Sequence, residues 1–139
     1  MRKTILAALL FWLGMSVPPT FADEAGEKAA GAVAPAWLAQ IDGGKYAASW
    51  QGASAYFRGA VTEKVWSDAL NRTRKPLGTL ISRKLATAQS ATSLPGAPDG
   101  NYVVMQFNTS FSNKKEAVET VTFTQEKDGK WRAVGYYIK

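Results

Sequence analysis

The hydrophobic pattern of this chain changes its period at Pro76, and this change constrains the fold class more than any other feature. Before Pro76, apolar residues recur three and four positions apart, which is the spacing of one helix face. After Pro76 they alternate, as in strands that bury one face. Helices followed by a run of strands predict an α+β domain, with the helices packed on one antiparallel sheet.

About three helices are predicted before Pro76. The first is expected from Pro35, because a missing N–H needs no partner in the first turn, and it ends at two glycines. The second covers residues 46–58, and the third follows Thr62, a suitable N-cap. The apolar side of this third helix consists of Val65, Trp66, Ala69 and Leu70. Residues 23–34 are either a flexible lead-in or the start of the first helix.

Four strands are predicted after Pro76, and they form a curved, cone-like meander. Their ranges are 79–92, 101–112, 115–126 and 130–138. The Asp-Gly pair at residues 128–129 is a strong signal for a hairpin turn between the last two. In the last strand, alternation puts Ala133 and Tyr136 on opposite faces. Helices and strands together make a single domain over residues 35–139.

The N-terminal segment has the layout of a cleavable signal peptide. Arg2 and Lys3 precede an apolar stretch at residues 5–17, and Thr20 and Ala22 are the small residues before the cut. The stretch of 13 residues is shorter than the roughly 20 that a membrane span needs. We therefore expect a signal peptide at residues 1–22, cleavage near Ala22-Asp23, a periplasmic or secreted protein, and no membrane span afterwards.

The absence of two residue types excludes much chemistry. The chain has neither His nor Cys, which excludes Ser-His-Asp and Cys-His catalysis and an ordinary zinc site. Neither a metal nor a cofactor is predicted. The chain has 17 Lys plus Arg and 11 Asp plus Glu, a net charge of +6. These positive charges are scattered instead of forming a dense stripe, so no nucleic-acid partner is predicted.

Two opposite charges occupy apolar strand faces. Glu119 shares its face with Val121 and Phe123, and Arg83 shares its face with Ile81 and Leu85. This pattern predicts a buried or half-buried ion pair between Glu119 and Arg83. The pair has either a purely structural role or lines a pocket and orients a ligand.

Other candidate binding residues lie on the predicted helix at 46–58, at the start of the strand at 101–112 and in the loop between two strands. They are Tyr46, Trp50, Tyr102, and Pro95, Gly96, Pro98 and Asp99 of the turn-rich segment 93–100. The leading hypothesis is a non-enzymatic module that binds a small molecule, a peptide or an envelope protein. The alternatives are a pocket enzyme that uses Glu119, Tyr46 or Tyr102 for acid–base chemistry, and an envelope assembly subunit that pairs through an open sheet edge. No catalytic residue and no oligomeric state is assigned.

Several motifs resemble a known family. They are WLAQIDGGKYAASW at 37–50, PGAPDGNY at 95–102, Glu119-Thr120, DGKW at 128–131 and GYY at 135–137. Together they resemble the uncharacterised bacterial domain-of-unknown-function 4019 family, across residues 33–139. The resemblance implies an exported domain without an assigned activity. The order of elements is also similar to the nuclear-transport-factor-like and cystatin-like α+β domains, whose cone-shaped fold implies a pocket. Some enzymes of that class use carboxylates and Tyr, but their catalytic residues match no positions here.

Overall fold

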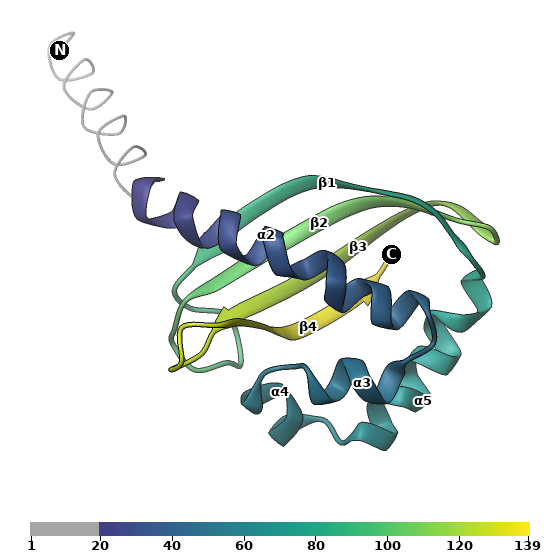
Figure 1. Cartoon of the computed structure of the whole chain (residues 1–139), viewed down its shortest axis with the longest axis horizontal. Coiled ribbons are helices and arrows are strands. Elements are labelled where there is room, and N and C mark those ends of the chain that lie inside the picture. The colour runs from purple at the N-terminus through teal and green to yellow at the C-terminus, as the bar shows by residue number, and fades with distance from the viewer. Residues whose placement is uncertain (1–19) are drawn as a thin grey trace, which may run out of the picture.

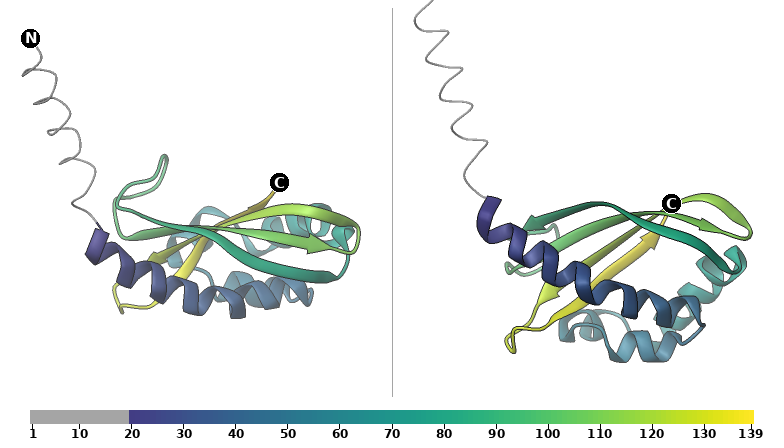
Figure 2. Two further views of the ribbon diagram at one scale, coloured as in Figure 1. Left: turned by 90° about the horizontal axis from the view of Figure 1, so that it is seen from above. Right: turned by 45° about the horizontal axis from the view of Figure 1, so that its top comes forward.

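The computed structural model describes residues 20–139, and residues 1–19 of the predicted signal peptide lie outside this range. The described part forms an α+β fold with four α-helices and one open, four-stranded antiparallel sheet. The long helix α2 lies across one face of the sheet, and the shorter helices α3, α4 and α5 gather beside strand β4 (Figure 1). The sheet is twisted and curved around α2 (Figure 2).

Helix α2 (Thr20–Asp42) is longer than the sequence pattern predicts. Pro35 was expected in the first turn, but it lies inside the helix, and residues 23–34 belong to the same helix. The buried side of α2 consists of Ala30, Ala34, Trp37, Leu38 and Ile41. Alanine is a weak apolar signal, so the sequence did not reveal this longer stripe. Packing of the stripe against the sheet offsets the hydrogen bond that Pro35 cannot donate.

The predicted helix over 46–58 is divided into α3 (Tyr46–Gln51) and α4 (Ala55–Ala60). Ser54 causes the break, because its backbone is extended and its side chain caps α4 by accepting a hydrogen bond from Phe57 N at 3.2 Å. The Ser54 N–H donates to the Ala133 carbonyl at 2.8 Å. The break therefore attaches the helices to β4.

Helix α5 (Glu63–Thr73) begins as predicted. Thr62 is its N-cap and accepts a hydrogen bond from Val65 N at 3.2 Å. Trp66 and Leu70 are buried, but Val65, expected on the same side, is 57 % exposed. The short 3-10 turn η1 (Lys75–Leu77) then leads into the sheet.

The strands form the predicted meander, in the order β1-β2-β3-β4. Their bounds are β1 Leu80–Ala91, β2 Tyr102–Phe111, β3 Lys114–Gln125 and β4 Trp131–Ile138. Each bound lies within one residue of its predicted position. The local signals of alternation and turn residues were therefore sufficient to locate all four strands.

Two faces differ from the alternation pattern because of irregular register. In the β3–β4 pairing, Thr122 lies opposite Gly135 but Phe123 lies opposite Ala133, which leaves Val134 as an extra residue. This bulge brings both Ala133 and Tyr136 to the core side, although alternation separated them. In the edge strand β1, Ile81 and Leu85 are exposed, so the prediction that they share a core face with Arg83 was wrong.

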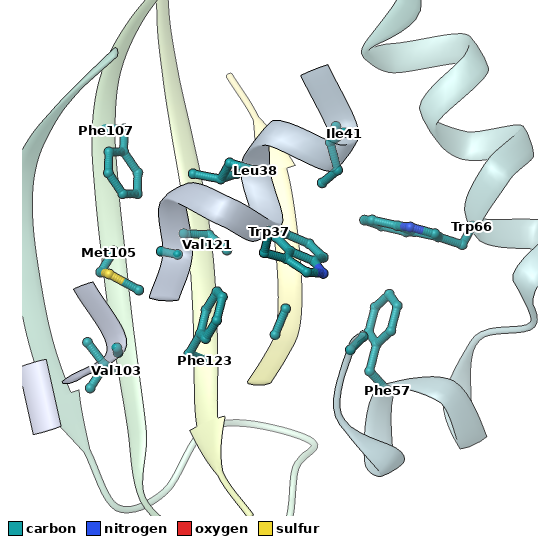
Figure 3. Close-up of a cluster of buried hydrophobic side chains, with 14 of the residues drawn as sticks. Trp37, Leu38, Ile41, Phe57, Trp66, Val103, Met105, Phe107, Val121 and Phe123 are labelled. Atoms are coloured by element: carbon teal, nitrogen blue, oxygen red, sulfur yellow. The ribbon is translucent and has the colours of Figure 1, made fainter. Parts of the chain in front are cut away.

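The core lies between α2, the sheet and α5, and aromatic side chains fill its centre (Figure 3). Trp37 stacks on Trp66 with ring centroids 6.1 Å apart and meets Phe123 edge-on at 6.0 Å. Both indole N–H groups donate hydrogen bonds to Ser49: that of Trp37 to its carbonyl at 2.8 Å, and that of Trp66 to its hydroxyl at 2.9 Å. The buried Ser49 therefore joins α2, α3 and α5, and no indole N–H of this pair is left without a partner.

Gly78, between η1 and β1, provides a test of the fold. It has φ 80° and ψ −150°, and a Cβ there would lie 2.1 Å from Ser112 Oγ. Gly129 also has a positive φ of 83°, but a Cβ there would meet nothing within 4 Å. We expect Gly129→Ala to lower the free energy of unfolding by about 1–2 kcal/mol, the strain of the left-handed backbone alone. Gly78→Ala should cost clearly more, because the clash adds to that strain; equal losses in urea unfolding would contradict this placement.

Candidate functional site

A buried ion network lies where the C-terminal end of α2 meets the sheet. Arg83 of β1 is at its centre, Glu119 comes from β3, Asp42 ends α2, and Arg74 follows α5. The Glu119 side chain is 0 % exposed, and the other three are at most slightly exposed. The network contains two cations and two anions, so its formal charges balance.

Arg83 binds both carboxylates. Its Nε and Nη2 donate to Glu119 Oε1 and Oε2 at 2.6 and 3.0 Å, which is the bidentate arrangement of strong Arg–carboxylate pairs. Its Nη1 and Nη2 also donate to Asp42 Oδ2 and Oδ1 at 2.8 and 2.9 Å. The predicted ion pair of Arg83 and Glu119 is therefore present, and Asp42 is a partner that the sequence analysis missed.

The pKa of Arg83 reflects opposing effects. Burial favours the neutral form and by itself lowers the pKa, but the hydrogen bonds to Asp42 and Glu119 and their charges outweigh it. The net result is a pKa above the ordinary value for arginine. The guanidinium therefore stays charged inside the fold.

Glu119 accepts two further hydrogen bonds. Thr109 Oγ1 donates to Oε1 at 2.7 Å, and the Tyr136 hydroxyl donates to Oε2. Burial, and next the charge of Glu119, raises the pKa of Tyr136, so this phenol remains protonated. No sequence signal identified Tyr136, because only the bulge at Val134 turns it toward Glu119. Both carboxylate oxygens of Glu119 therefore accept hydrogen bonds from buried or half-buried side chains, those of Arg83, Thr109 and Tyr136.

Arg74 closes the network on the side of α5. Its Nη2 contacts Asp42 Oδ1 at 3.2 Å, its Nη1 donates to the Gly78 carbonyl at 2.7 Å, and its guanidinium lies 4.4 Å above the Phe111 ring. Within residues 20–139, its buried Nε has no hydrogen-bond partner. Sequence analysis missed Arg74, because basic residues flank it in a segment typical of solvated surface.

The predicted residues Tyr46 and Trp50 are not among the hydrogen-bond partners of Glu119, which are Arg83, Thr109 and Tyr136. Half-buried Tyr46 lines an open pocket of about 780 Å³ at the end of α2, together with Asp42 and Arg74. Trp50 is half-buried, and its indole N–H donates to the Val61 carbonyl at 2.7 Å. This bond gives Trp50 a structural role.

The predicted loop borders a second pocket, which we call the loop groove. This groove of about 580 Å³ lies between the start of α4, residues 98–100, the end of β3 and the start of β4. Three hydrogen bonds hold the loop: Tyr56 OH donates to the Gly96 carbonyl at 2.8 Å, Tyr102 OH donates to the Pro98 carbonyl, and Gly100 N donates to the Thr92 carbonyl at 3.0 Å. The wall of the groove is therefore fixed to both α4 and β2.

Predicted residues contribute unequally to the loop groove. Pro98, Asp99 and Tyr102 line it, whereas Gly96 supports it through its carbonyl and Pro95 does not line it. The exposed ring of Tyr56, which sequence analysis missed, is on the opposite wall. A tyrosine at a short helix start has no pattern that would have distinguished it.

Charges in the loop groove are partly paired. Arg132 Nη1 lies 2.6 Å from Glu126 Oε1, and Nη2 lies 2.9 Å from Asp128 Oδ2. The hydrogen bond from Arg132, followed by that from Lys130 N, lowers the pKa of Asp128 to about 2. Within residues 20–139 the Asp99 carboxylate forms no hydrogen bond or ion pair, so it is available to a ligand.

Between Thr20 and Lys139, no group of three acidic side chains is arranged to hold a metal ion. None of the helices over the same residues combines the length and apolar character needed to cross a membrane.

A family model described as "Protein of unknown function (DUF4019)" matches residues 33–136. No curated protein and no solved structure matches the chain. The similarity to the nuclear-transport-factor-like fold therefore stays a prediction.

Substitution of Glu119 tests the buried network. Glu119→Gln leaves the buried Arg83 without its full countercharge, so we expect a loss of about 3–5 kcal/mol in the free energy of unfolding. The matched control is Lys64→Gln, which breaks the ion pair with Asp68 on the surface of α5, where the two side chains are 83 % and 46 % exposed. This control should change stability by less than about 1 kcal/mol. Equal effects of the two substitutions in chemical denaturation would contradict the network's importance.

Proposed function

The chain belongs to the DUF4019 family of proteins of unknown function, and from that premise we propose that its domain is an exported binding module. The observation that supports this proposal most is the loop groove, a preformed depression that combines an aromatic ring with an unpaired carboxylate. The ligand we propose for it is a peptide segment or a small polar molecule.

The state of Glu119 favours binding over catalysis. A general base must reach a substrate proton within hydrogen-bond distance. Glu119 is fully buried, and its oxygens accept from Arg83, Thr109 and Tyr136. A substrate would have to displace these donors and unpair a buried charge. The Tyr102 hydroxyl is similarly committed to the Pro98 carbonyl.

The loop groove has the properties of a preorganised site. Its loop is held by Tyr56, Tyr102 and a backbone hydrogen bond, so binding need not order it first. The exposed face of Tyr56 offers apolar contact, and Asp99 offers a charged hydrogen-bond acceptor. Such a combination suits a ligand that has an apolar part and a hydrogen-bond donor.

The assembly-subunit alternative has weaker support. Strand β1 is an edge, but its register shifts at Ile81 and at Ala86, and bulges of this kind disfavour pairing with another chain. The exposed Lys84 on the same edge also disfavours pairing with another chain. At the other edge, the Ser54 N–H donates to the Ala133 carbonyl of β4, so this carbonyl already has a partner within the chain.

Export rests on the N-terminal pattern and fits the position of α2. The contacts of α2 with the sheet include the close approach of Gly26 to Trp131 and the hydrogen bond of Glu27 with Ser90. Both lie after the predicted cut at Ala22, so cleavage would leave them intact. Glu24 and Glu27 would then stand near the new start of α2, where negative charges are favourable.

The binding proposal predicts where ligands act. In a screen of short peptides and polar metabolites, we expect hits to shift the amide resonances of Tyr56, Asp99 and Thr124. Asp99→Ala should weaken these hits by about tenfold or more, since a charge-assisted hydrogen bond is lost. Asp68→Ala on α5 removes a surface carboxylate outside the groove, one that is paired with Lys64, and should leave affinity unchanged. Shifts that map only to the pocket beside Tyr46 would refute the loop groove as the site.

The export proposal predicts a processed chain. When the full chain is expressed in a bacterium, the periplasmic fraction should contain a protein that begins at Asp23 by N-terminal sequencing. Ala22→Arg should block the cut, because signal cleavage needs a small residue there. Recovery of the intact chain in the cytoplasm, for both the parent protein and the variant, would rule out export through this segment.

A further inference from the structure

A separate groove, which we call the α2 groove, runs between α2 and the turn that joins β3 to β4. Its volume is about 580 Å³, within the range of small-molecule sites. Ala29, Val33 and Ala36 of α2 form one side, and Phe123 and Trp131 of the strands form the other. Arg132 also lines the α2 groove, and among the described residues it is the one that lines the loop groove as well.

The surface of the α2 groove is mainly apolar. The Val33 side chain on α2 is 41 % exposed, and part of its exposed surface lines this groove. Trp131 is fixed against α2 by Gly26, where a Cβ would lie only 3.2 Å from the indole Cζ2. The indole therefore stands as a wall whose position depends on the absence of a side chain at residue 26.

The charges that line the α2 groove are positive. They belong to Lys130 and Arg132, and no acidic residue lines it. Glu126 and Asp128, which neutralise Arg132, line the loop groove instead. Within residues 20–139, the Lys130 ammonium forms no hydrogen bond or ion pair. The Lys130 charge acts on nearby Asp128, which faces the loop groove, but its ammonium has no direct partner among residues 20–139. An apolar channel with such a cation at its rim is complementary to an apolar chain with an anionic end.

We propose that the α2 groove binds a single-chain anionic amphiphile, such as a long-chain carboxylate. The hydrocarbon chain lies along Val33 and Trp131, and the carboxylate meets the Lys130 ammonium. This site goes beyond the proposed function, because it uses a different groove and a different ligand class. Either site can therefore fail in experiment without the other.

The test titrates the purified protein with octanoate, decanoate and dodecanoate below their micelle concentrations. Tryptophan fluorescence and the indole resonance of Trp131 report binding. We expect affinity to rise about two- to fourfold for each added methylene, because each is partly buried. Val33→Glu should weaken dodecanoate binding at least tenfold, since it places a carboxylate in the apolar channel. Val65→Glu is the matched control, because Val65 is 57 % exposed on α5, and it should leave affinity within twofold.

Lys130 is tested separately. Lys130→Gln should weaken dodecanoate binding about two- to fivefold, as expected for an exposed ion pair, and leave dodecanol binding unchanged. Lys127→Gln, in the same turn but outside the α2 groove, should change neither. The proposal is overturned if affinity is independent of chain length, if dodecyltrimethylammonium binds as well as dodecanoate, or if only phosphatidylglycerol vesicles bind. Equal losses from Val33→Glu and Val65→Glu would also overturn it.

Discussion

The buried guanidinium of Arg83 is the group on which the arrangement of the elements depends. An isolated charge in this position would be strongly destabilising, so it requires two carboxylates that come from different parts of the chain. Glu119 supplies one from β3 and Asp42 the other from the end of α2. Through Glu119 the network reaches Tyr136 of β4, and through Asp42 it reaches Arg74 after α5. Through Thr109 the network also includes β2, so it links the ends of α2 and α5 to all four strands.

This network lies at one end of α2, and the two proposed binding grooves lie toward the other end. The end near Asp42 contains the paired charges of the network and the open pocket of about 780 Å³ beside Tyr46. The opposite half of α2, near Gly26 and Val33, faces the β3–β4 turn, where grooves form. Arg132 separates the loop groove from the α2 groove, since its partners Glu126 and Asp128 face only the former.

Local patterns in the sequence were sufficient for much of this structure. The α+β class and the four strand positions follow from hydrophobic period and turn residues, which act over a few neighbouring positions. The ion pair of Arg83 and Glu119 was also predicted, because Glu119 interrupts the buried face of Val121 and Phe123. The same argument was wrong for Arg83, since Ile81 and Leu85 are exposed. Of the loop residues named as binding candidates, Pro98 and Asp99 line a groove, and their role as ligand contacts is a proposal.

By itself, then, the sequence determined the fold class, the order of the strands and the need for a buried ion pair. Only the tertiary structure decided the length of α2, where Ala30 and Ala34 are held by packing that no local signal announces. It also decided the bulge at Val134, which turns Tyr136 toward Glu119. The physical reason is the same in each case. These features are stabilised by contacts between residues far apart in the chain, and such contacts leave no periodic trace in the sequence.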